Sequence, residues 1–372
     1  MQQTARTRIF FLDNLKSAVI LMVILHHAAM AYMTVPVASW GLRDVRTCVI
    51  FDWLVAWDDT FVMPLMFFVS GYFALGSAVK YSAADFLRGK WFRIGWPWLI
   101  GILLPAPLTW HIAHHGFADW GKLAEWKFGT GFLYSAQYWY LNLLLWFYLL
   151  TLVLRKSMPD FFRRREHPLR PGRMFLPTFG LACFLGMLLV NLLVPDEQWC
   201  SFILFECQWV RLPLYLGFFF CGAWAWRNCW FVSGGYVPER KSWSVAALFC
   251  SSGYLGLRAW LYLAGTAIPA PWLIFADNAV RVLLCIVCSF CAIALFQHYA
   301  DVSGPVWKKL SACAFAIYWI QQPVVDVFAR LTLTWEINCG VKFAMVSLAT
   351  AAVSFLLAEH LLLKLPFFAP RK

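Results

Sequence analysis

The chain has 372 residues, of which 62% are hydrophobic and 13% are charged, and its mean hydropathy is +0.64. This composition excludes a soluble globular domain, and the apolar runs are continuous rather than alternating, which argues against a membrane β-barrel. The net charge of +12 does not indicate nucleic-acid binding, because Lys and Arg gather in every second loop, as the orientation of a membrane protein requires.

We expect about ten membrane-spanning helices, and therefore an all-α, polytopic transmembrane bundle that forms one domain over residues 1–372. The expected spans cover roughly residues 15–34, 60–79, 92–112, 138–154, 174–194, 209–228, 243–263, 274–299, 311–330 and 341–363. An even number of spans puts both termini on one side, and the excess of Lys and Arg in the loops of that side predicts that it is cytoplasmic. The first apolar run lacks a small-residue cleavage site, so we do not expect a removed signal peptide.

Polar residues distinguish the first span, over residues 8–32. It has Asp13 and Lys16 near its start and His26 and His27 near its end. Ionisable groups in a membrane span are costly and usually mark a functional site. Eleven residues separate Lys16 from His27, which is three turns plus about 20° and roughly 16 Å along the axis, so the two share a face. His26 lies about 80° from Lys16, which makes His27 the better candidate; the alternative is a snorkelling lysine with two packed histidines.

The expected outer segment of residues 35–59 is acidic and aromatic. Its aspartates are Asp44, Asp52, Asp58 and Asp59. Two interpretations stay open for this segment: contact with a polar acceptor molecule, or a solvated connector. The next span ends in FFVSGYF, where Ser70 and Gly71 permit close approach of another helix. Ser70 is not expected to be a nucleophile, because the glycine two residues before it in a nucleophile elbow is missing.

Basic residues follow this span at the expected cytoplasmic boundary. They are Arg88, Lys90 and Arg93, and Pro97 comes soon after them. Cations in such a cluster can neutralise several phosphates of a nucleotide-like ligand. The alternative is that they only orient the protein and contact lipid headgroups, and the same alternative applies to the basic loop of residues 155–173.

Histidine and cysteine clusters elsewhere have a structural and a functional interpretation each. The three histidines within residues 111–115 have helical spacing that suits a metal, but no carboxylate or thiol stands at a firm ligand offset, so we expect no metal site. The cysteines within residues 285–291 lack the fourth ligand of an iron–sulfur run and are expected to pack as small apolar groups. Cys200 and Cys207 are candidates for a disulfide in an outer loop.

Two Asp-to-Arg pairs lie in or near the later apolar spans. Asp277 with Arg281 and Asp326 with Arg330 each stand four residues apart, and such residues can form an ion pair on one helix. The pattern alone leaves open whether these charges serve the structure or bind an acceptor.

Several short motifs occur in the order that is typical of one family of membrane enzymes. These motifs are Leu12, Asp13, Leu15 and Lys16 followed by His27, then Phe67 to Phe73, then Lys90, Arg93 and Pro97, then Trp139-Tyr140-Leu141, then Ile317 to Pro323. In this order they resemble the acyltransferase-3 family of integral membrane O-acyltransferases. The resemblance runs from the first to the ninth expected span, and it looks closest to members that modify periplasmic glucans with succinyl groups.

The resemblance implies an acyl-CoA-dependent O-acyltransferase, most typical of the bacterial inner membrane. Acyl-CoA on the cytoplasmic side would be the donor, and a hydroxyl of a glycan or other acceptor on the outer side would be the acceptor. The family requires neither a bound cofactor nor a metal. The expected partners are therefore acyl-CoA, a carbohydrate or other hydroxyl acceptor and the lipid bilayer, with a homo-oligomer as an open option and no nucleic acid.

The resemblance also suggests roles for particular residues. His27 would be the catalytic base, because imidazole titrates near neutral pH. Lys16, Arg88, Lys90 and Arg93 would bind the donor, and Asp13 would pair with Lys16. Ser70, Trp139 and Tyr318 would orient groups or shape the pocket.

Two departures from the family pattern affect these assignments. Lys16 stands where arginine is usual, which keeps the charge but loses the planar fork of a guanidinium. Gln321 stands where histidine is common, which puts any role of the late motif in doubt. A transporter or flippase of a polar or lipid-linked substrate is the alternative function, since it also needs charge within the membrane, although we detect no inverted repeat.

Overall fold

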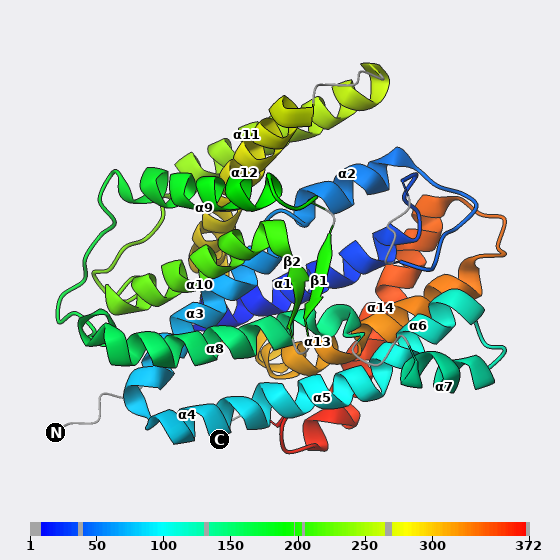
Figure 1. The fold of residues 1–372 in the computed structure, drawn as a ribbon, viewed down its shortest axis with the longest axis horizontal. Helices are drawn as coiled ribbons and strands as arrows, with labels where there is room; N and C mark the ends of the chain where they lie inside the picture. Colours follow the sequence, from blue (N-terminus) through cyan, green and yellow to red (C-terminus); the bar gives the residue numbers. More distant parts are fainter. Residues whose placement is uncertain are drawn as a thin grey trace.

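The computed structural model describes residues 9–35, 40–129, 134–196, 198–202, 205–264 and 270–369. Within these ranges the fold is helical apart from one two-stranded antiparallel hairpin (Figure 1). The helices of the first half are α1 (Phe10–Met30), α2 (Val49–Asp58), α3 (Val62–Lys80), α4 (Ala83–Lys90), α5 (Trp96–Leu103), α6 (Pro105–His115), α7 (Gly121–Phe128) and α8 (Trp139–Ser157). The second half contains α9 (Phe175–Asn191), the hairpin β1 (Trp199–Phe202) and β2 (Phe205–Gln208), α10 (Leu212–Arg227), α11 (Arg240–Ala264), α12 (Ala270–Tyr299), α13 (Pro305–Thr332) and α14 (Cys339–His360). Short η segments are η1 (Trp91–Gly95), η2 (Ala136–Tyr138), η3 (Pro159–Phe162), η4 (Trp209–Arg211) and η5 (Leu362–Lys364).

Helix α1 runs through the middle of the bundle (Figure 1). It packs against α2, α3, α12, α13 and α14. Its 21 residues correspond to about 31 Å, which matches the thickness of a bilayer hydrocarbon core. The polar residues of the first span are therefore surrounded by other helices, as charged groups within a membrane require.

Six helical segments are long and apolar enough to cross a membrane. They are Phe10–Met30, Val49–Lys80, Ala136–Ser157, Trp272–Tyr299, Pro305–Thr332 and Cys339–Lys364, and Phe175–Asn191 is a shorter apolar helix. The six segments agree with six of the expected spans. The protein is thus a multi-pass membrane protein of helical fold, while the count of ten spans and the side of the termini stay predictions.

The expected span at residues 92–112 is helical, but it is not one regular α-helix. The π-helical segment η1 precedes α5, and α5 ends at Leu103 before α6 begins at Pro105. Proline lacks the backbone N–H that would continue the helical hydrogen bonds, which explains the break before Pro105. Helix α5 is attached to α13, because the backbone carbonyl of Pro97 accepts a hydrogen bond of 2.8 Å from the indole of Trp319.

Helices α3 and α10 approach each other at two glycines. A Cβ atom on Gly71 would overlap the backbone carbonyl of Phe219, and one on Gly222 would overlap that of Phe68. Neither position tolerates a side chain without separating the helices. The close helix approach expected at Ser70 and Gly71 is confirmed.

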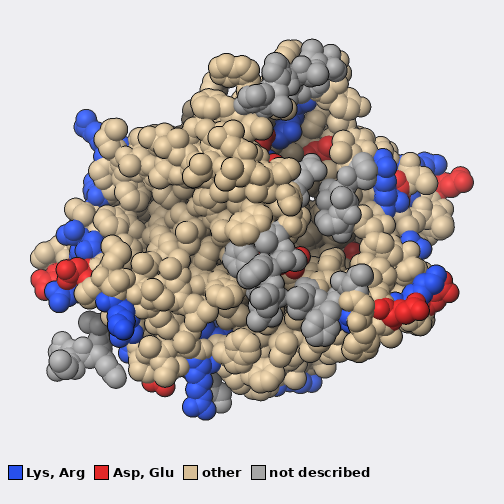
Figure 2. Space-filling view, viewed as in Figure 1, with Lys and Arg blue, Asp and Glu red and all other residues tan. Residues whose placement is uncertain are grey.

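On the face shown in Figure 2, charged side chains lie mostly toward the left and right ends and along the lower edge, and the middle of this face is largely uncharged. On the face shown, Lys and Arg predominate at the left end, whereas the right end carries both signs. The helices of the bundle run between these ends (Figure 1). An apolar band with charged ends is the arrangement expected of a protein that lies across a bilayer.

Candidate active site

His27 contacts Gln321 in the interior of the bundle. The Nδ1 atom of His27 lies 2.9 Å from Nε2 and 3.1 Å from Oε1 of the Gln321 amide. His27 is half-buried on α1, whereas Gln321 on α13 is fully buried. Gln321, which stands where the family commonly has a histidine, therefore contacts His27, the expected catalytic base.

The Gln321 amide can hold the imidazole of His27 in either neutral tautomer. If Oε1 of the amide faces Nδ1, it accepts a hydrogen bond from Nδ1–H, and Nε2 of the imidazole then has a free lone pair. If the amide is rotated by half a turn, its Nε2–H donates to an unprotonated Nδ1. Only the first arrangement leaves Nε2 of His27 ready to accept a proton, so Gln321 is suited to orient His27 as a base.

The other face of the site is formed by Trp40. The rings of Trp40 and His27 are stacked, with centroids 5.6 Å apart and an angle of 18° between their planes. The chain after Trp40 returns to the end of α1, where the backbone N–H of Asp44 donates to Ala31 O at 2.8 Å. The Asp44 carboxylate also lies 2.7 Å from Nζ of Lys342, and both side chains are fully buried. These bonds fix the segment that carries Trp40.

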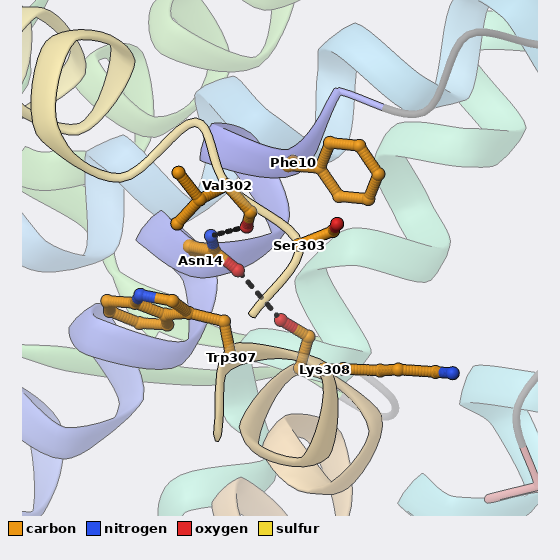
Figure 3. A pocket seen from close by; sticks show the side chains of 7 residues that line it. Phe10, Asn14, Val302, Ser303, Trp307 and Lys308 are labelled. Atoms are coloured by element: carbon orange, nitrogen blue, oxygen red, sulfur yellow. Dashed lines mark hydrogen bonds between the residues drawn. The ribbon is translucent and has the colours of Figure 1, made fainter. Parts of the chain in front are cut away.

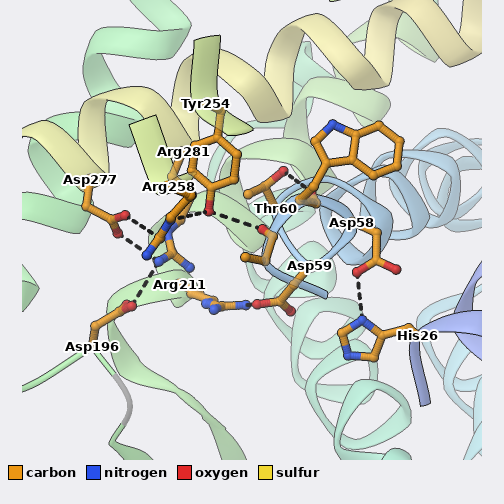
Figure 4. A network of polar contacts seen from close by, with 12 residues as sticks. His26, Asp58, Asp59, Thr60, Asp196, Arg211, Tyr254, Arg258, Asp277 and Arg281 are labelled. Carbon is orange, nitrogen blue, oxygen red and sulfur yellow. Dashed lines mark hydrogen bonds and ion pairs between the residues drawn. The ribbon is translucent and has the colours of Figure 1, made fainter. Parts of the chain in front are cut away.

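His26 has a carboxylate partner of its own (Figure 4). Its Nδ1 atom lies 2.7 Å from Oδ1 of Asp58, which is buried at the end of α2. The rings of His26 and His27 meet edge to face at 5.5 Å. A histidine with an adjacent carboxylate is a common general-base arrangement, so His26 is a second candidate besides His27. The only signal for it in the sequence was the acidic character of residues 35–59.

A balanced set of charges continues from Asp58 toward α11 and α12 (Figure 4). It consists of three acidic and three basic side chains: Asp59, Asp196, Asp277, Arg211, Arg258 and Arg281. The Arg281 guanidinium lies 2.9 Å from Asp196 and 2.8 Å from Asp277. Since each charge has a partner of opposite sign, the network is mainly structural and positions the end of α2 beside α1.

The aspartates of residues 35–59 do not form a solvated connector. Asp52 accepts hydrogen bonds from the hydroxyl and the backbone N–H of Thr34, at 2.7 and 2.9 Å. Asp44, Asp58 and Asp59 pair with Lys342, His26 and Arg211, as described above. The solvated interpretation is therefore wrong for these four side chains, because each has a partner within the protein: Thr34 for Asp52, and a residue of α14, α1 or η4 for the other three.

The ion pair expected at the other end of α1 is confirmed. The Lys16 ammonium lies 2.7 Å from Oδ1 of Asp13 and 4.9 Å from the centroid of the Phe73 ring on α3. Eleven residues of helix separate Lys16 from His27, which corresponds to roughly 16 Å. A cation thus lies at one end of α1 and an imidazole near its other end.

The sequence matches the family model for an acyltransferase domain, Acyl_transf_3, over residues 9–359. The chain belongs to the acyltransferase-3 family. Comparisons with curated proteins and with solved structures gave no match. Family membership makes the protein a multi-pass membrane acyltransferase, and it favours this function over a transporter.

Three of the four cations expected to bind the donor in this acyltransferase lie on α4 and η1. Arg88 is exposed to solvent, whereas Lys90 lies 4.2 Å from the ring centroid of Tyr148 and 5.2 Å from that of Phe86. Arg93 donates a hydrogen bond of 3.0 Å to Ala369 O near the end of the described chain. Of the three, Arg88 has the greatest exposure to solvent, while the other two also contact the protein.

The other family motifs of the acyltransferase meet in an aromatic cluster between α3, α8 and α13. The Ser70 hydroxyl lies 2.8 Å from that of Tyr140, whose ring meets the Tyr318 ring edge to face at 5.9 Å. Trp139 packs on Tyr215 at 5.4 Å. The structure thus brings Ser70 and Tyr318 together through Tyr140, and it places Trp139 beside them on α8.

Of the two expected Asp-to-Arg pairs, one is confirmed and the other is wrong. Asp277 and Arg281 form the expected ion pair on α12. Asp326 and Arg330 form no ion pair within the described part of the chain. The Arg330 guanidinium instead packs over Gly116, where a Cβ atom would lie 2.8 Å from its Nε, and Asp326 is buried among the helices.

The histidine and cysteine clusters occupy structural positions. His111 contacts Ala118 O at 2.8 Å and stacks on Trp120, which closes the turn after α6. The cysteines of residues 285–291 are buried in α12, as expected of small apolar groups. Cys200 and Cys207 face each other as register partners in the hairpin, but the Cys200 side chain lies outside the described part, so their disulfide stays a prediction.

A cavity of about 280 Å³ lies beside the start of α1 (Figure 3). It is lined by Phe10, Asn14, Val302, Ser303, Trp307, Lys308 and Ser311. The Asn14 amide donates to Ala300 O at 2.7 Å and to Val302 O at 3.0 Å, and the Ser311 hydroxyl donates to Asn14 Oδ1 at 3.2 Å. These bonds fasten α1 to the turn between α12 and α13, so this cavity is a product of that junction rather than part of the His27 site.

Proposed function

We propose that the protein transfers an acyl group from cytoplasmic acyl-CoA to a hydroxyl of a glycan or another acceptor on the outer side of a bacterial inner membrane. The observation that carries this proposal is the contact between His27 and Gln321 inside the helical bundle. It supplies a base with a fixed orientation, half-buried, at the position that matches the histidine of the family motif.

In this proposal His27 is the general base. It takes the proton of the acceptor hydroxyl while the hydroxyl oxygen attacks the carbonyl carbon of the thioester. The C–S bond then breaks, and the proton passes from His27 to the thiolate of CoA. Such proton transfer typically contributes about 10² to 10⁴ in rate, and neither a metal nor a bound cofactor takes part.

The donor enters at the end of α1 that carries Lys16 and Asp13. Arg88, Lys90 and Arg93 attract the phosphates of CoA at the membrane boundary. The long pantetheine arm then spans the roughly 16 Å between Lys16 and His27. Trp139, Ser70 and Tyr318 contribute to the walls of the acyl or acceptor pocket.

The test is release of CoA thiol and transfer of a labelled acyl group by the purified protein in lipid nanodiscs. His27→Ala should lower kcat by about 10² to 10⁴, while the matched variant His298→Ala, at an exposed position of α12, should keep wild-type activity. Full activity of a stable His27→Ala protein would remove histidine catalysis at this position from the proposal.

His26→Ala separates the two histidines. If His27 is the base, His26→Ala and Asp58→Ala should reduce activity less than His27→Ala does, and they should lower thermal stability because each leaves a buried polar partner unpaired. The opposite ranking of the activities would assign the base to the His26–Asp58 pair.

A further inference from the structure

The indole N–H of Trp40 has no hydrogen-bond partner in the described part of the chain, although the atom is buried. Leaving a buried donor unpaired costs roughly 1–3 kcal/mol, so such groups are rare unless a ligand or water satisfies them. This donor belongs to the ring that stacks on His27, with centroids 5.6 Å apart. An unpaired donor beside the base therefore points to a partner that arrives with the substrates.

Three features hold the chain segment that follows Trp40 in place before any substrate binds. The next residue, Gly41, packs so closely on His114 that a Cβ atom would lie 2.8 Å from its ring. Leu42 is buried, with 1% of its surface exposed. Asp44 is bonded to Ala31 O and to Lys342. Donors fixed in this way stabilise developing charge effectively, because no reorganisation is needed during the reaction.

Two other side chains that contact His27 in the described structure already have hydrogen-bond partners. The Gln321 amide contacts the imidazole itself. The ring of His26, which lies 5.5 Å from that of His27, pairs with Asp58 through Nδ1. The backbone N–H groups around His27 lie within α1, where they bond to the preceding turn. Among the described side chains that contact His27, Trp40 is thus the one whose buried donor has no partner.

We propose that the Nε1–H of Trp40 donates a hydrogen bond to the thioester carbonyl oxygen as that oxygen becomes negatively charged. This inference rests on the proposed acyl transfer at His27. The acceptor oxygen bonds to the carbonyl carbon, its proton passes to His27, and the π electrons of the carbonyl move onto its oxygen, which Trp40 stabilises. When those electrons return, the C–S bond breaks, and the proton on His27 goes to the departing thiolate, so that free CoA and the O-acyl product leave.

The test is Trp40→Phe, which keeps an aromatic ring against His27 and removes only the donor and part of the ring area. We expect kcat to fall roughly 10²- to 10³-fold, as for other single oxyanion donors, with little change in the KM for acyl-CoA. The melting temperature should stay the same or rise, because an unsatisfied buried N–H is removed. Replacing Trp40 by 3-benzothienylalanine, whose sulfur replaces the N–H in a ring of equal size, should give the same loss of kcat.

Trp98→Phe is the matched control. Trp98 on α5 is buried, and its indole N–H also has no partner in the described structure, but it has no ring contact or hydrogen bond with His27 there. Its variant should therefore retain kcat. Equal kcat values for the Trp40 and Trp98 variants would overturn the proposal, and so would a loss of kcat at Trp40 that follows a matching loss of folded protein. If the wild-type protein does not transfer acyl groups from acyl-CoA, the proposed function itself is wrong. If the wild-type protein is active, the kcat values of the Trp40 variants test only the proposed role of Trp40.

Discussion

Lys342 and Asp44 form an ion pair of 2.7 Å in which both side chains are fully buried. Lys342 also donates to Leu333 O at 3.3 Å, so the ammonium has two acceptors. The pair joins α14 to the segment that carries Trp40. Because Asp44 also bonds to the end of α1, one buried contact couples the last helix of the bundle to the walls of the candidate site.

Breaking this pair from one side should be costly. Lys342→Met leaves the Asp44 carboxylate buried without its cation, and we expect a loss of about 3–5 kcal/mol in stability, measured by thermal unfolding in nanodiscs. The double variant Lys342→Met with Asp44→Leu removes both charges and should recover much of that loss. A double variant no more stable than the single one would show that the charges do not act as a pair.

Gln321 should act on the reaction through His27. Gln321→Met keeps the volume but removes both hydrogen-bonding groups, and a base out of position by about 1 Å can lose 10²-fold in rate, so we expect kcat to fall by roughly 10- to 100-fold. Gln321→His restores a ring nitrogen of the type common in the family and should recover activity. The neighbouring Gln322→Met is the control. A normal kcat in the Gln321→Met protein would contradict the positioning role.

Much of this arrangement could be predicted from the sequence, and the failures have physical causes. The motif spacing singled out His27 as the candidate base, and the apolar runs predicted the six helical segments that are long and apolar enough to cross a membrane. The contacts of Trp40 and Asp58 with the histidines were missed because they depend on how the chain folds back after α1, which the periodicity of one helix does not describe. The break at Pro105 was visible as a residue type, but apolar composition outweighed it in defining the span.

The wrong pairing of Asp326 and Arg330 has a similar origin. A spacing of four residues permits an ion pair on a helix but does not require one, and such pairs stabilise isolated helices by only about 0.2–0.5 kcal/mol. That is too little to outweigh tertiary packing, and the Arg330 side chain instead occupies the space that Gly116 leaves open. For Asp277 and Arg281 the spacing predicted the ion pair correctly, because Asp196 and Arg258 form further ion pairs with the same two residues.

Glycine substitutions should test the close packing of α3 and α10. Gly71→Ala and Gly222→Ala each place a methyl group against a backbone carbonyl of the facing helix, which cannot move away as a side chain could. Overpacking typically costs about 1–3 kcal/mol, and we expect at least this loss in each variant by thermal unfolding. Gly253→Ala on α11 is the control, because its Cβ would have open space around it. Equal stability of all three variants would refute the tight crossing.

The hairpin predicts a dependence of stability on pH. Glu206 on β2 accepts a hydrogen bond from the Ser135 hydroxyl, and burial raises the pKa of its carboxyl from 4.5 to about 7. The folded state therefore holds this proton more tightly than the unfolded state does. The protonated Glu206 carboxyl therefore contributes most to the stability of the folded state below pH 4.5. This contribution is lost as the pH rises toward 7, so the melting temperature should fall over this interval. Glu206→Gln should reduce the change of melting temperature with pH, whereas Glu125→Gln, at an exposed position, should leave that change as in the wild type. An unaltered pH dependence in the Glu206→Gln protein would show that other groups cause it.

Removing the cations on α4 and η1 should weaken donor binding without changing the chemistry. Each charge that contacts a phosphate typically contributes about 1.5–3 kcal/mol, so Arg88→Gln combined with Lys90→Gln should raise the KM for acyl-CoA by roughly tenfold or more while kcat stays near the wild-type value. The effect should shrink for an acyl-pantetheine donor, which lacks the nucleotide phosphates, and at high ionic strength. Arg170→Gln removes an equally exposed charge from the basic loop of residues 155–173 and is the control. An unchanged KM for acyl-CoA in the double variant, or the same change for acyl-pantetheine, would mean that these cations orient the protein in the membrane and do not bind the donor.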